Sequence, residues 1–209
     1  MRKKLLKIGV LSDTHCRGLK DLPSIVMKTF KDVDAFIHAG DAQYASFLKE
    51  LVKIAPVYSV MGNHDKEWKT FPLKQTELLS VNGYILGVVH GHEGEGRHTI
   101  DRACNTFNLS EVDIVIYGHD HKDVGVKYRG RTTFLNPGSP TDIRQPFSSI
   151  AILRIGRRVD IEMVRWSNEK DKKTSSKSSS SKRQQRTKQA DKNTNNFRNK
   201  KAGSRRWAK

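Results

Sequence analysis

Cysteines, long apolar runs and acidic residues are all scarce in this chain of 209 residues. Its two cysteines give no disulfide framework, so we expect a reduced, cytoplasmic protein. No stretch approaches the roughly 20 apolar residues that span a bilayer. The basic N-terminal segment lacks the small-residue cleavage site of a signal peptide. The sequence therefore predicts neither a membrane protein nor a disulfide-rich secreted one.

The shortage of acidic residues is concentrated at one end of the chain. The whole sequence carries a net charge of +17, and residues 167–209 hold 15 Lys and Arg against 3 Asp and Glu, with almost no aliphatic side chains. Such a segment cannot bury enough apolar surface to offset the entropy of ordering it. We predict one domain over residues 1–166 and a disordered basic tail over 167–209. The tail is either a solvated extension or a binder of nucleic acid without sequence choice.

Within the predicted domain, short apolar runs alternate with amphipathic ones. The first part reads as β-α-β-α-β, which indicates a parallel sheet covered by helices: strands Leu5–Leu11, Ala35–Ala39 and Val57–Val60, and helices at about 20–31 and 44–54. Asn82-Gly83 suits a type I′ hairpin turn between strands Thr76–Val81 and Tyr84–Val89. The remainder predicts one mixed sheet or two packed sheets, from a helix at about 98–109 and strands Asp113–Tyr117, Val124–Tyr128, Thr132–Leu135, Ile150–Ile155 and Val159–Val164.

Polar clusters follow five of these strands, at the edge where ligands bind in open α/β sheets. They read Ser12-Asp13-Thr14-His15, Gly40-Asp41, Gly62-Asn63-His64-Asp65, His90-Gly91-His92 and Gly118-His119-Asp120-His121. Taken alone, Asp-x-His and Gly-Asp are weak signals, and Gly-Asn-His-Asp is also typical of a loop with a helix cap. Gly-His-x-His is stronger, because imidazoles two residues apart on extended backbone share a face. Their joint occurrence after successive strands predicts one convergent site.

The residue types in these clusters are those of a metal site. Carboxylates, imidazoles and one amide oxygen suit Mn, Fe, Zn and similar ions. The candidates are too numerous for one tetrahedral ion, and fit two ions about 3.5–4 Å apart that share a carboxylate. Such a pair clamps the attacking and leaving oxygens of phosphoryl transfer.

The order of these motifs resembles the calcineurin-like metallophosphoesterase superfamily over residues about 6–165. The His-Gly-His form and the segment Asn136-Pro137-Gly138-Ser139 are similar to its small phosphodiesterase branch, which has the non-catalytic Vps-type retromer subunit as a relative. The resemblance implies an α/β fold, a four-layer αββα sandwich of two mixed β-sheets flanked by helices.

The resemblance also implies a role for each matching residue. It assigns the metal ligands in three groups: Asp13, His15 and His121 at the first ion, Asp41 as the bridge, and Asn63, His90 and His119 at the second ion. It places His64 near the leaving group as the catalytic residue, and His92 behind the ligands or against phosphate. Asn136 and Ser139 either shape the floor of the site or form a turn. Tyr44 departs from the family pattern, because many members have an Asp there that orients His64.

Three further residues carry non-functional interpretations. We expect His38 to be a hydrogen-bonded core histidine, and His98 to be a surface residue at a helix start. Cys16 should point away from His15 and bind no metal.

The predicted function is that of a metal-dependent phosphodiesterase, which hydrolyses a phosphate ester with a metal-bridging hydroxide. We expect two divalent transition-metal ions, with manganese as the first choice and Ni, Fe, Zn and Co as alternatives. Two other functions stay open: a metal-binding interaction scaffold on the same fold, and a nucleic-acid-associated protein that uses the basic tail. The sequence leaves the phosphate-ester substrate unidentified and the oligomeric state open, a homodimer included.

Overall fold

The computed structural model describes residues 4–122 and 124–168. Their strands form two five-stranded sheets, each with parallel and antiparallel neighbours. No helix in these residues has the length and apolarity needed to cross a membrane. The two mixed sheets confirm the predicted fold class.

The first sheet carries the parallel β-α-β-α-β start of the chain at its centre. From edge to edge its strands are β10 (Val159–Ser167), β9 (Phe147–Ile155), β1 (Leu6–Leu11), β2 (Ala35–His38) and β3 (Val57–Ser59). β1, β2 and β3 are parallel, while β9 runs antiparallel to both β1 and β10. The carboxyl ends of the parallel strands therefore share one edge of this sheet.

The second sheet is built from the middle of the chain. Its strands, in order, are β4 (Thr76–Val81), β5 (Tyr84–Val89), β6 (Ile114–Ile116), β8 (Thr132–Asn136) and β7 (Gly125–Arg129). The hairpin between β4 and β5 has the predicted bounds, and Asn82 and Gly83 both adopt positive φ, at 52° and 84°. Positive φ at both turn positions is what a type I′ turn requires, so this prediction is confirmed.

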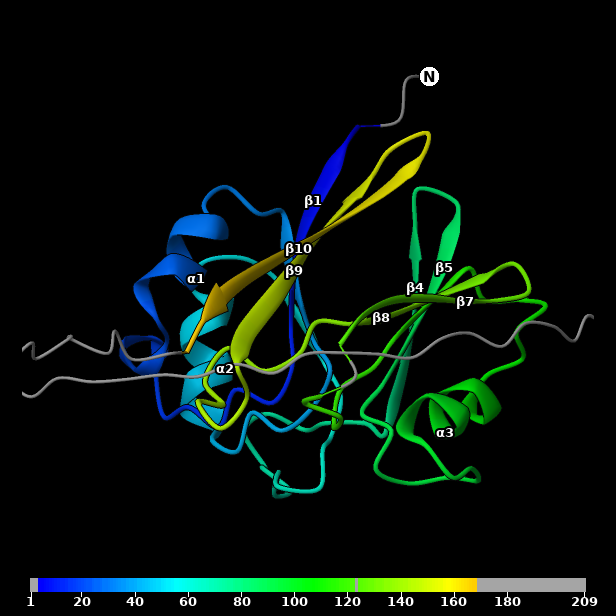
Figure 1. Cartoon of the computed structure of the whole chain (residues 1–209). Helices are drawn as coiled ribbons and strands as arrows, with labels where there is room; N and C mark the ends of the chain where they lie inside the picture. The colour runs from blue at the N-terminus through cyan, green and yellow to red at the C-terminus, as the bar shows by residue number, and fades with distance from the viewer. Residues whose placement is uncertain (1–3, 123, 169–209) are drawn as a thin grey trace, which may run out of the picture. The chain divides into compact units, whose positions relative to one another are not determined.

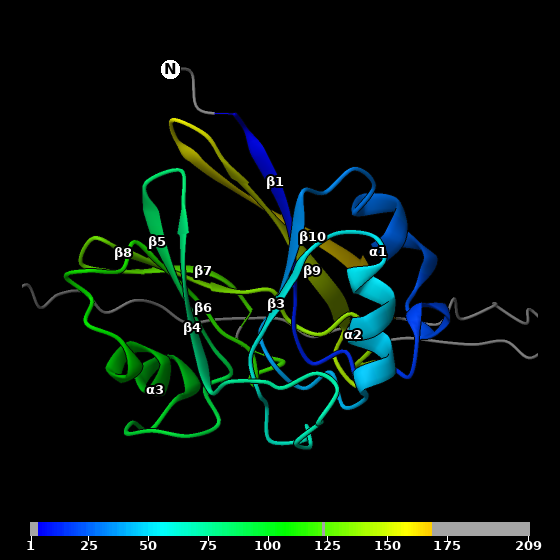
Figure 2. The same ribbon diagram turned by 180° about the vertical axis from the view of Figure 1, so that it is seen from behind.

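Helices cover the outer face of each sheet, which gives four layers (Figures 1 and 2). The helices α1 (Ser24–Thr29) and α2 (Ala45–Val52) lie on the first sheet, and α3 (Thr99–Thr106) lies on the second. Three apolar clusters separate these layers. The central cluster joins side chains of the two sheets, such as Val10 and Leu86, both fully buried. The layered core is thus the αββα sandwich that the resemblance implied.

The predicted helices begin and end differently in the structure. The segment 20–31 is not one helix: a 3₁₀ turn, η1 (Leu19–Asp21), is separated from α1 by Leu22 and Pro23. Proline cannot donate a backbone hydrogen bond and restricts the residue before it to extended conformations. α2 and α3 are shorter than their predicted ranges of 44–54 and 98–109 by one to three residues at each end. The tail lies outside the described residues apart from Ser167 and Asn168, so the two-part domain division stays a prediction.

Candidate metal centre

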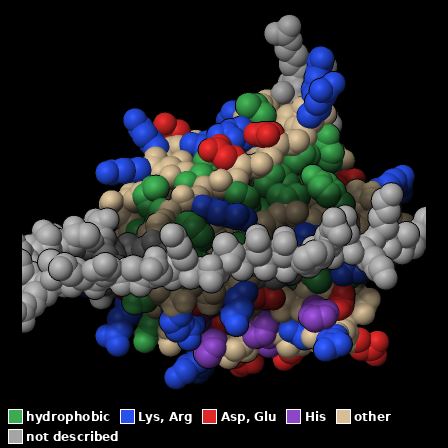
Figure 3. Space-filling view, viewed as in Figure 1, with side chains coloured by type: hydrophobic (Ala, Val, Ile, Leu, Met, Phe, Trp, Pro, Cys, Tyr) green, Lys and Arg blue, Asp and Glu red, His purple; other side chains and the backbone are tan. Residues whose placement is uncertain are grey.

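The candidate ligands lie in loops that follow the carboxyl ends of five strands. Asp13 and His15 follow β1, and Asp41 follows β2. The other loops, after β3, β5 and β6, supply Asn63, His90, His119 and His121. Figure 3 shows histidine side chains gathered at the lower edge of the molecule, with Lys and Arg side chains beside them.

Four of these candidates adopt a backbone conformation that residues other than glycine rarely use. Asp13, His15, Asp41 and His119 have φ of 53°, 49°, 58° and 66°. Left-handed backbone costs about 1–3 kcal/mol at such a residue and tends to concentrate at functional sites. The loops are therefore held in strained conformations where the ligand side chains converge.

Two glycines allow the loops to approach one another closely. A Cβ atom on Gly118 would overlap the Ser12 hydroxyl, and one on Gly62 would overlap the Asp41 carboxylate. Asp65 also ties these loops, because its carboxylate accepts the backbone N–H of Asp41 and of Gly62, both at 2.9 Å. The glycines before Asn63 and His119 are thus needed for packing around the ligands.

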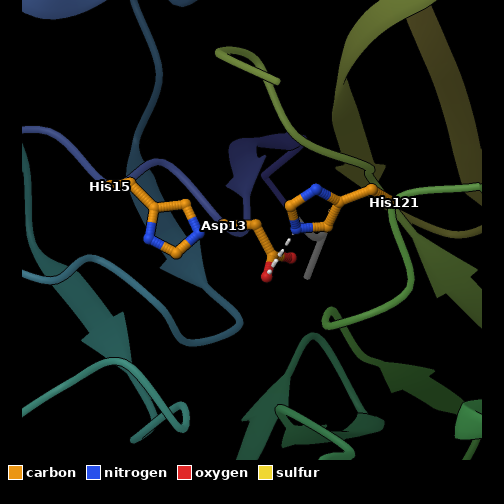
Figure 4. Close-up of side chains that lie close together, drawn as sticks. All are labelled: Asp13, His15 and His121. Carbon is orange, nitrogen blue, oxygen red and sulfur yellow. Dashed lines mark ion pairs between the residues drawn. The ribbon is translucent and has the colours of Figure 1, made fainter. Parts of the chain in front are cut away.

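The first group of candidates is Asp13, His15 and His121, whose donor atoms lie within 4.8 Å of one another (Figure 4). His121 Nε2 is 3.2 Å from Asp13 Oδ1. Asp13 is 1% exposed, and its Oδ1 receives no well-aligned hydrogen bond from the described residues. A buried carboxylate oxygen without a donor is costly. A cation between these three side chains would satisfy it, so the group fits a metal ion.

Asp41 joins this group to the second one. Its Oδ2 lies 3.9 Å from His15 Nε2 and 3.4 Å from His90 Nε2. Its Oδ1 accepts the backbone N–H of His64 at 2.8 Å. Burial acts to raise the pKa of Asp41, but His90, together with the His64 N–H and His15, outweighs it, and the pKa falls to about 2. One carboxylate oxygen therefore faces imidazole nitrogens of both groups, as a bridging ligand must.

The second group closes around the amide of Asn63. Asn63 Oδ1 lies 3.1 Å from His90 Nε2 and 3.1 Å from His119 Nδ1. Asp13, Asp41 and His90 also have donor atoms within 4.8 Å of one another. The structure thus brings all seven predicted ligands into one cluster.

The imidazoles of His90 and His121 are oriented through their second nitrogen. His90 Nδ1 lies 2.7 Å from the carbonyl oxygen of Ala39, and His121 Nδ1 lies 2.6 Å from Asp142 Oδ2. Both contacts leave Nε2 facing the cluster, the arrangement found around metal-bound histidines. Asp13 and Asp142 together raise the pKa of His121 to about 9.

Sequence reasoning missed Asp142. It is 8% exposed and also pairs with Arg144, whose Nε donates to Asp142 Oδ1 at 2.7 Å. Hydrogen bonds from Arg144, and then from His121, hold the pKa of Asp142 well below its usual range. Asp142 lies in a turn, where aspartate is common for local reasons. No spacing or strand end marked it as part of the site.

The predicted catalytic residue His64 lies at the exposed rim of the cluster, with its ring centroid 5.2 Å from that of His15. No carboxylate of the described residues hydrogen-bonds its ring. Tyr44, at the position of the family's orienting Asp, instead packs under the Arg17 guanidinium at 5.3 Å. His92 lies behind the second group, 5.2 Å from His90 between ring centroids, and burial lowers its pKa.

The remaining candidates support the loops rather than the ligand atoms. Ser139 Oγ donates to the Asp13 carbonyl at 2.8 Å, and Asn136 Nδ2 donates to the Asp120 carbonyl at 2.7 Å. His38 is fully buried, as predicted, with Nε2 3.0 Å from Thr14 Oγ1. Its Nδ1 has no hydrogen-bond partner among the described residues, and burial lowers its pKa to about 4. The prediction of a fully hydrogen-bonded His38 was therefore wrong for one nitrogen.

The structure places the other two residues where they were expected, while the absence of metal binding by Cys16 stays a prediction. His98 is an exposed residue at the N-cap of α3. Cys16 is buried, and its thiol donates to the Thr14 carbonyl at 3.1 Å instead of facing the ligands.

Residues 6–158 match the sequence model of the "Calcineurin-like phosphoesterase superfamily domain", so the chain belongs to this family. The resemblance drawn from the motifs is thereby confirmed. Metallophosphoesterases use divalent metal ions, and this chain carries candidate groups that could hold them.

Comparison with individual proteins agrees with this assignment. The chain is 33% identical over 160 residues to a "Probable metallophosphoesterase" of Methanothermobacter thermautotrophicus, covering 76% of this chain and 91% of the relative. It is 26% identical over 175 residues to a "Phosphodiesterase" of Methanocaldococcus jannaschii, covering 76% of this chain and 99% of the relative. A Vps29 from Entamoeba histolytica, complexed with Zn²⁺, superposes with a TM-score of 0.61 at 22% identity over 78% of this chain and 100% of its own. That last likeness shows the shared fold.

Proposed function

We propose that this chain is a two-metal phosphodiesterase. The observation that carries the proposal is a cluster with two features. One oxygen of Asp41 faces imidazoles of both groups, and a buried oxygen of Asp13 receives no well-aligned hydrogen bond from the described residues. The proposed ligands are Asp13, His15 and His121 for one ion, Asn63, His90 and His119 for the other, and Asp41 for both. The name of the M. jannaschii relative supports a diester as the substrate.

The residues of the chain have distinct tasks in this proposal. When bound, two divalent ions supply the charge that activates a water molecule and neutralises phosphate oxygens. Asp41, with its pKa lowered to about 2, stays ionised as a ligand across the physiological pH range. His64 at the rim protonates the leaving oxygen, and its exposure leaves room for an ester group beside it. His92, behind the second group, helps to hold phosphate.

Manganese is the metal that we propose for the cell. Mixed imidazole, carboxylate and amide ligation suits Mn, Fe, Co, Ni and Zn alike, and a Vps29 of the same fold is described as a Zn²⁺ complex. Loading the chain with each metal in turn and comparing turnover tests this choice.

The test is to load the purified chain with Mn²⁺, measure metal by mass spectrometry, and assay bis(p-nitrophenyl) phosphate. We expect two ions per chain, hydrolysis that a chelator abolishes, and recovery when Mn²⁺ is returned. His121→Ala should lose metal and activity, while His98→Ala, which changes an exposed histidine outside the cluster, should lose neither. Binding of fewer than one ion per chain would end the proposal.

The alternative function is a metal-binding interaction scaffold, which the likeness to Vps29 supports. The two functions are separated by the same assay. A chain that binds two ions but hydrolyses none of a panel of phosphomonoesters, diesters, cyclic nucleotides and nucleic acids would favour the scaffold.

Nucleic acid is a second proposed partner, through the basic segment 167–209. Its 15 Lys and Arg could neutralise several phosphates. We expect a chain truncated after residue 168 to bind RNA with a flatter slope of log K against log salt than the full chain. Equal slopes would favour a solvated extension. Cytoplasmic location and a homodimer remain predictions.

A further inference from the structure

A second cavity opens beside the metal cluster. The cavity over the cluster has a volume of about 600 Å³ and is lined by Asp13, Asp41, His64 and their neighbours. The adjacent cavity has a volume of about 580 Å³. Both are lined by His15, His121 and Arg144, so they meet along the first ligand group. A substituent on a phosphate held at the cluster could therefore extend into the second cavity, which we call the side cavity.

One wall of the side cavity is a stacked cation and aromatic ring. The Arg17 guanidinium carbon lies 5.3 Å from the centre of the Tyr44 ring, and both residues line the cavity. The Arg17 backbone is anchored on both sides, because its N–H donates to Asp21 at 2.9 Å and its carbonyl accepts from the Ser46 hydroxyl. Tyr44 is the N-cap of α2. The backbone positions of both side chains are thus held by hydrogen bonds and by the start of a helix.

Charged side chains of both signs line the side cavity. Arg17 and Asp21 line it together, as do Arg144 and Asp142, which are already paired at 2.7 Å. The lining of this cavity therefore carries both signs of charge side by side, instead of the purely positive patch that a second phosphate would need. The amide of Gln43 and the hydroxyl of Thr141 line it as well and offer hydrogen bonds to a neutral polar group.

Size and chemistry together limit the group that fits. A volume of about 580 Å³ is within the range of about 300–1,000 Å³ that accommodates drug-sized ligands. A planar group stacks well on an aromatic ring or a guanidinium plane. Ile143 and Cys16 add apolar surface to the lining, but an aliphatic arm would leave the ring face and the hydrogen-bonding groups without a partner. The cavity suits a neutral, planar, hydrogen-bonding substituent.

We infer that the side cavity binds the nucleoside arm of a nucleotidyl phosphodiester, and that Tyr44 and Arg17 determine this preference. The inference rests on the proposed phosphodiesterase function, since it places the reacting phosphate over the metal cluster. It also gives Tyr44 a role at the position where many family members have an orienting Asp: the residue recognises the substrate arm instead of holding His64.

Two diesters with the same leaving group test this inference. Thymidine 5′-(p-nitrophenyl) phosphate carries a nucleoside arm, and ethyl p-nitrophenyl phosphate carries an arm too short to reach Tyr44. With the Mn²⁺-loaded full chain, we expect kcat/KM for the thymidine ester to exceed that for the ethyl ester by about tenfold or more, since a base stacked on an aromatic side chain contributes on this scale. The measured quantity is the ratio of the two kcat/KM values.

Variants of Tyr44 test whether contacts with Tyr44 and Arg17 cause the difference in kcat/KM between the two esters. Tyr44→Leu, which keeps bulk but removes the aromatic face, should bring the ratio close to one, while Tyr44→Phe should keep most of it. Tyr128→Ala removes another tyrosine, 74% exposed on β7, and should leave the ratio as it is. Thermal unfolding of each variant identifies any that fail to fold, and Arg17→Gln then provides a second change in the same wall.

The outcomes separate the two proposals. A wild-type ratio near one, or an unchanged ratio in both Tyr44→Leu and Arg17→Gln, overturns the nucleoside arm while the phosphodiesterase stands. If neither ester is hydrolysed, the proposed function fails. In that case, calorimetric titration with thymidine 5′-monophosphate tests the side cavity without any measurement of turnover. Binding that Tyr44→Leu weakens would support nucleoside binding in the cavity, and the absence of binding would overturn it.

Discussion

The two halves of the candidate metal centre orient their histidines by different means. On one side, His121 is held by the carboxylate of Asp142, which Arg144 holds in turn. On the other side, His90 is held by the backbone carbonyl of Ala39 at the end of β2. His90 is fully buried, whereas the side chain of His121 is 13% exposed.

The support of His90 is part of the backbone, whereas the support of His121 is a side chain that can be replaced by mutation. A backbone carbonyl cannot be removed by substitution, and it stays where the sheet places it. A carboxylate adds negative charge, raises the basicity of the imidazole and depends on its own partner. We therefore expect the His121 half to be the one whose metal affinity responds to mutation of a supporting side chain.

Replacement of Asp41 should have the largest effect, because this residue joins the two halves. Asp41→Asn removes the charge that we propose both ions share, so turnover of bis(p-nitrophenyl) phosphate should fall by several orders of magnitude at saturating Mn²⁺. The melting temperature should stay close to wild type, since the apolar clusters do not include Asp41. Asp34→Asn, which changes an aspartate paired with Lys4 far along the sheet, is the control. Near wild-type turnover would refute the bridging role.

Loss of His64 should have the next largest effect, and it should depend on the leaving group. General acids contribute about 10²–10⁴-fold, and His64→Ala should lose that much on a diester with a poor leaving group. It should lose far less with p-nitrophenolate, which leaves without a proton. His64 lies beside His15, on the half that Asp142 supports. Equal losses on both substrates would instead indicate that His64 binds phosphate.

Replacement of Asp142 tests the comparison of the two halves directly. Removal of the partner of a metal-bound histidine typically costs about 10–100-fold in affinity, so Asp142→Asn should weaken one Mn²⁺ ion by this factor and leave the other at its wild-type affinity. Calorimetric titration reports both affinities without any measurement of turnover. Asp101→Asn, which breaks an exposed pair with Arg129 at 2.8 Å, is the matched control. Two ions weakened alike would mean that the halves are not independent.

Much of the fold could be predicted because hydrophobic periodicity and turn residues act locally. The hairpin around Asn82-Gly83 was predicted with its correct bounds, since that turn depends on two residues. The helix predicted over 20–31 was right for Ser24–Thr29, which forms α1, and wrong before it, because Pro23 is the N-cap of α1 and separates this helix from the 3₁₀ turn η1. Strand ends also located the candidate ligands that the structure brings together, since parallel strands carry their carboxyl ends to one edge.

The supporting residues could not be predicted in the same way. Asp142 is 21 positions from the histidine that it holds, and Asp65 connects loops more than 20 positions apart. No local pattern marks such contacts, because they form only when β9 pairs with β1 and the loops are brought together. Tyr44 was recognised as a departure from the family pattern, but its stacking with Arg17 follows from the folded loop.

The smallest expected effect concerns the reactivity of the two cysteine thiols. It tests whether Asp142 supports only His121 or also the loop after β1. Cys16 follows His15 and is 2% exposed, and burial raises the pKa of its thiol to about 12. Thiolates are the reactive form, so at pH 8 Cys16 should react with a disulfide reagent far more slowly than the partly exposed Cys104. We expect one fast thiol in the native chain, two after denaturation, and none that is fast in native Cys104→Ser. If Asp142 supports only the histidine, Asp142→Asn should leave Cys16 slow. A second fast thiol in that variant would show that Asp142 also holds the loop after β1 closed.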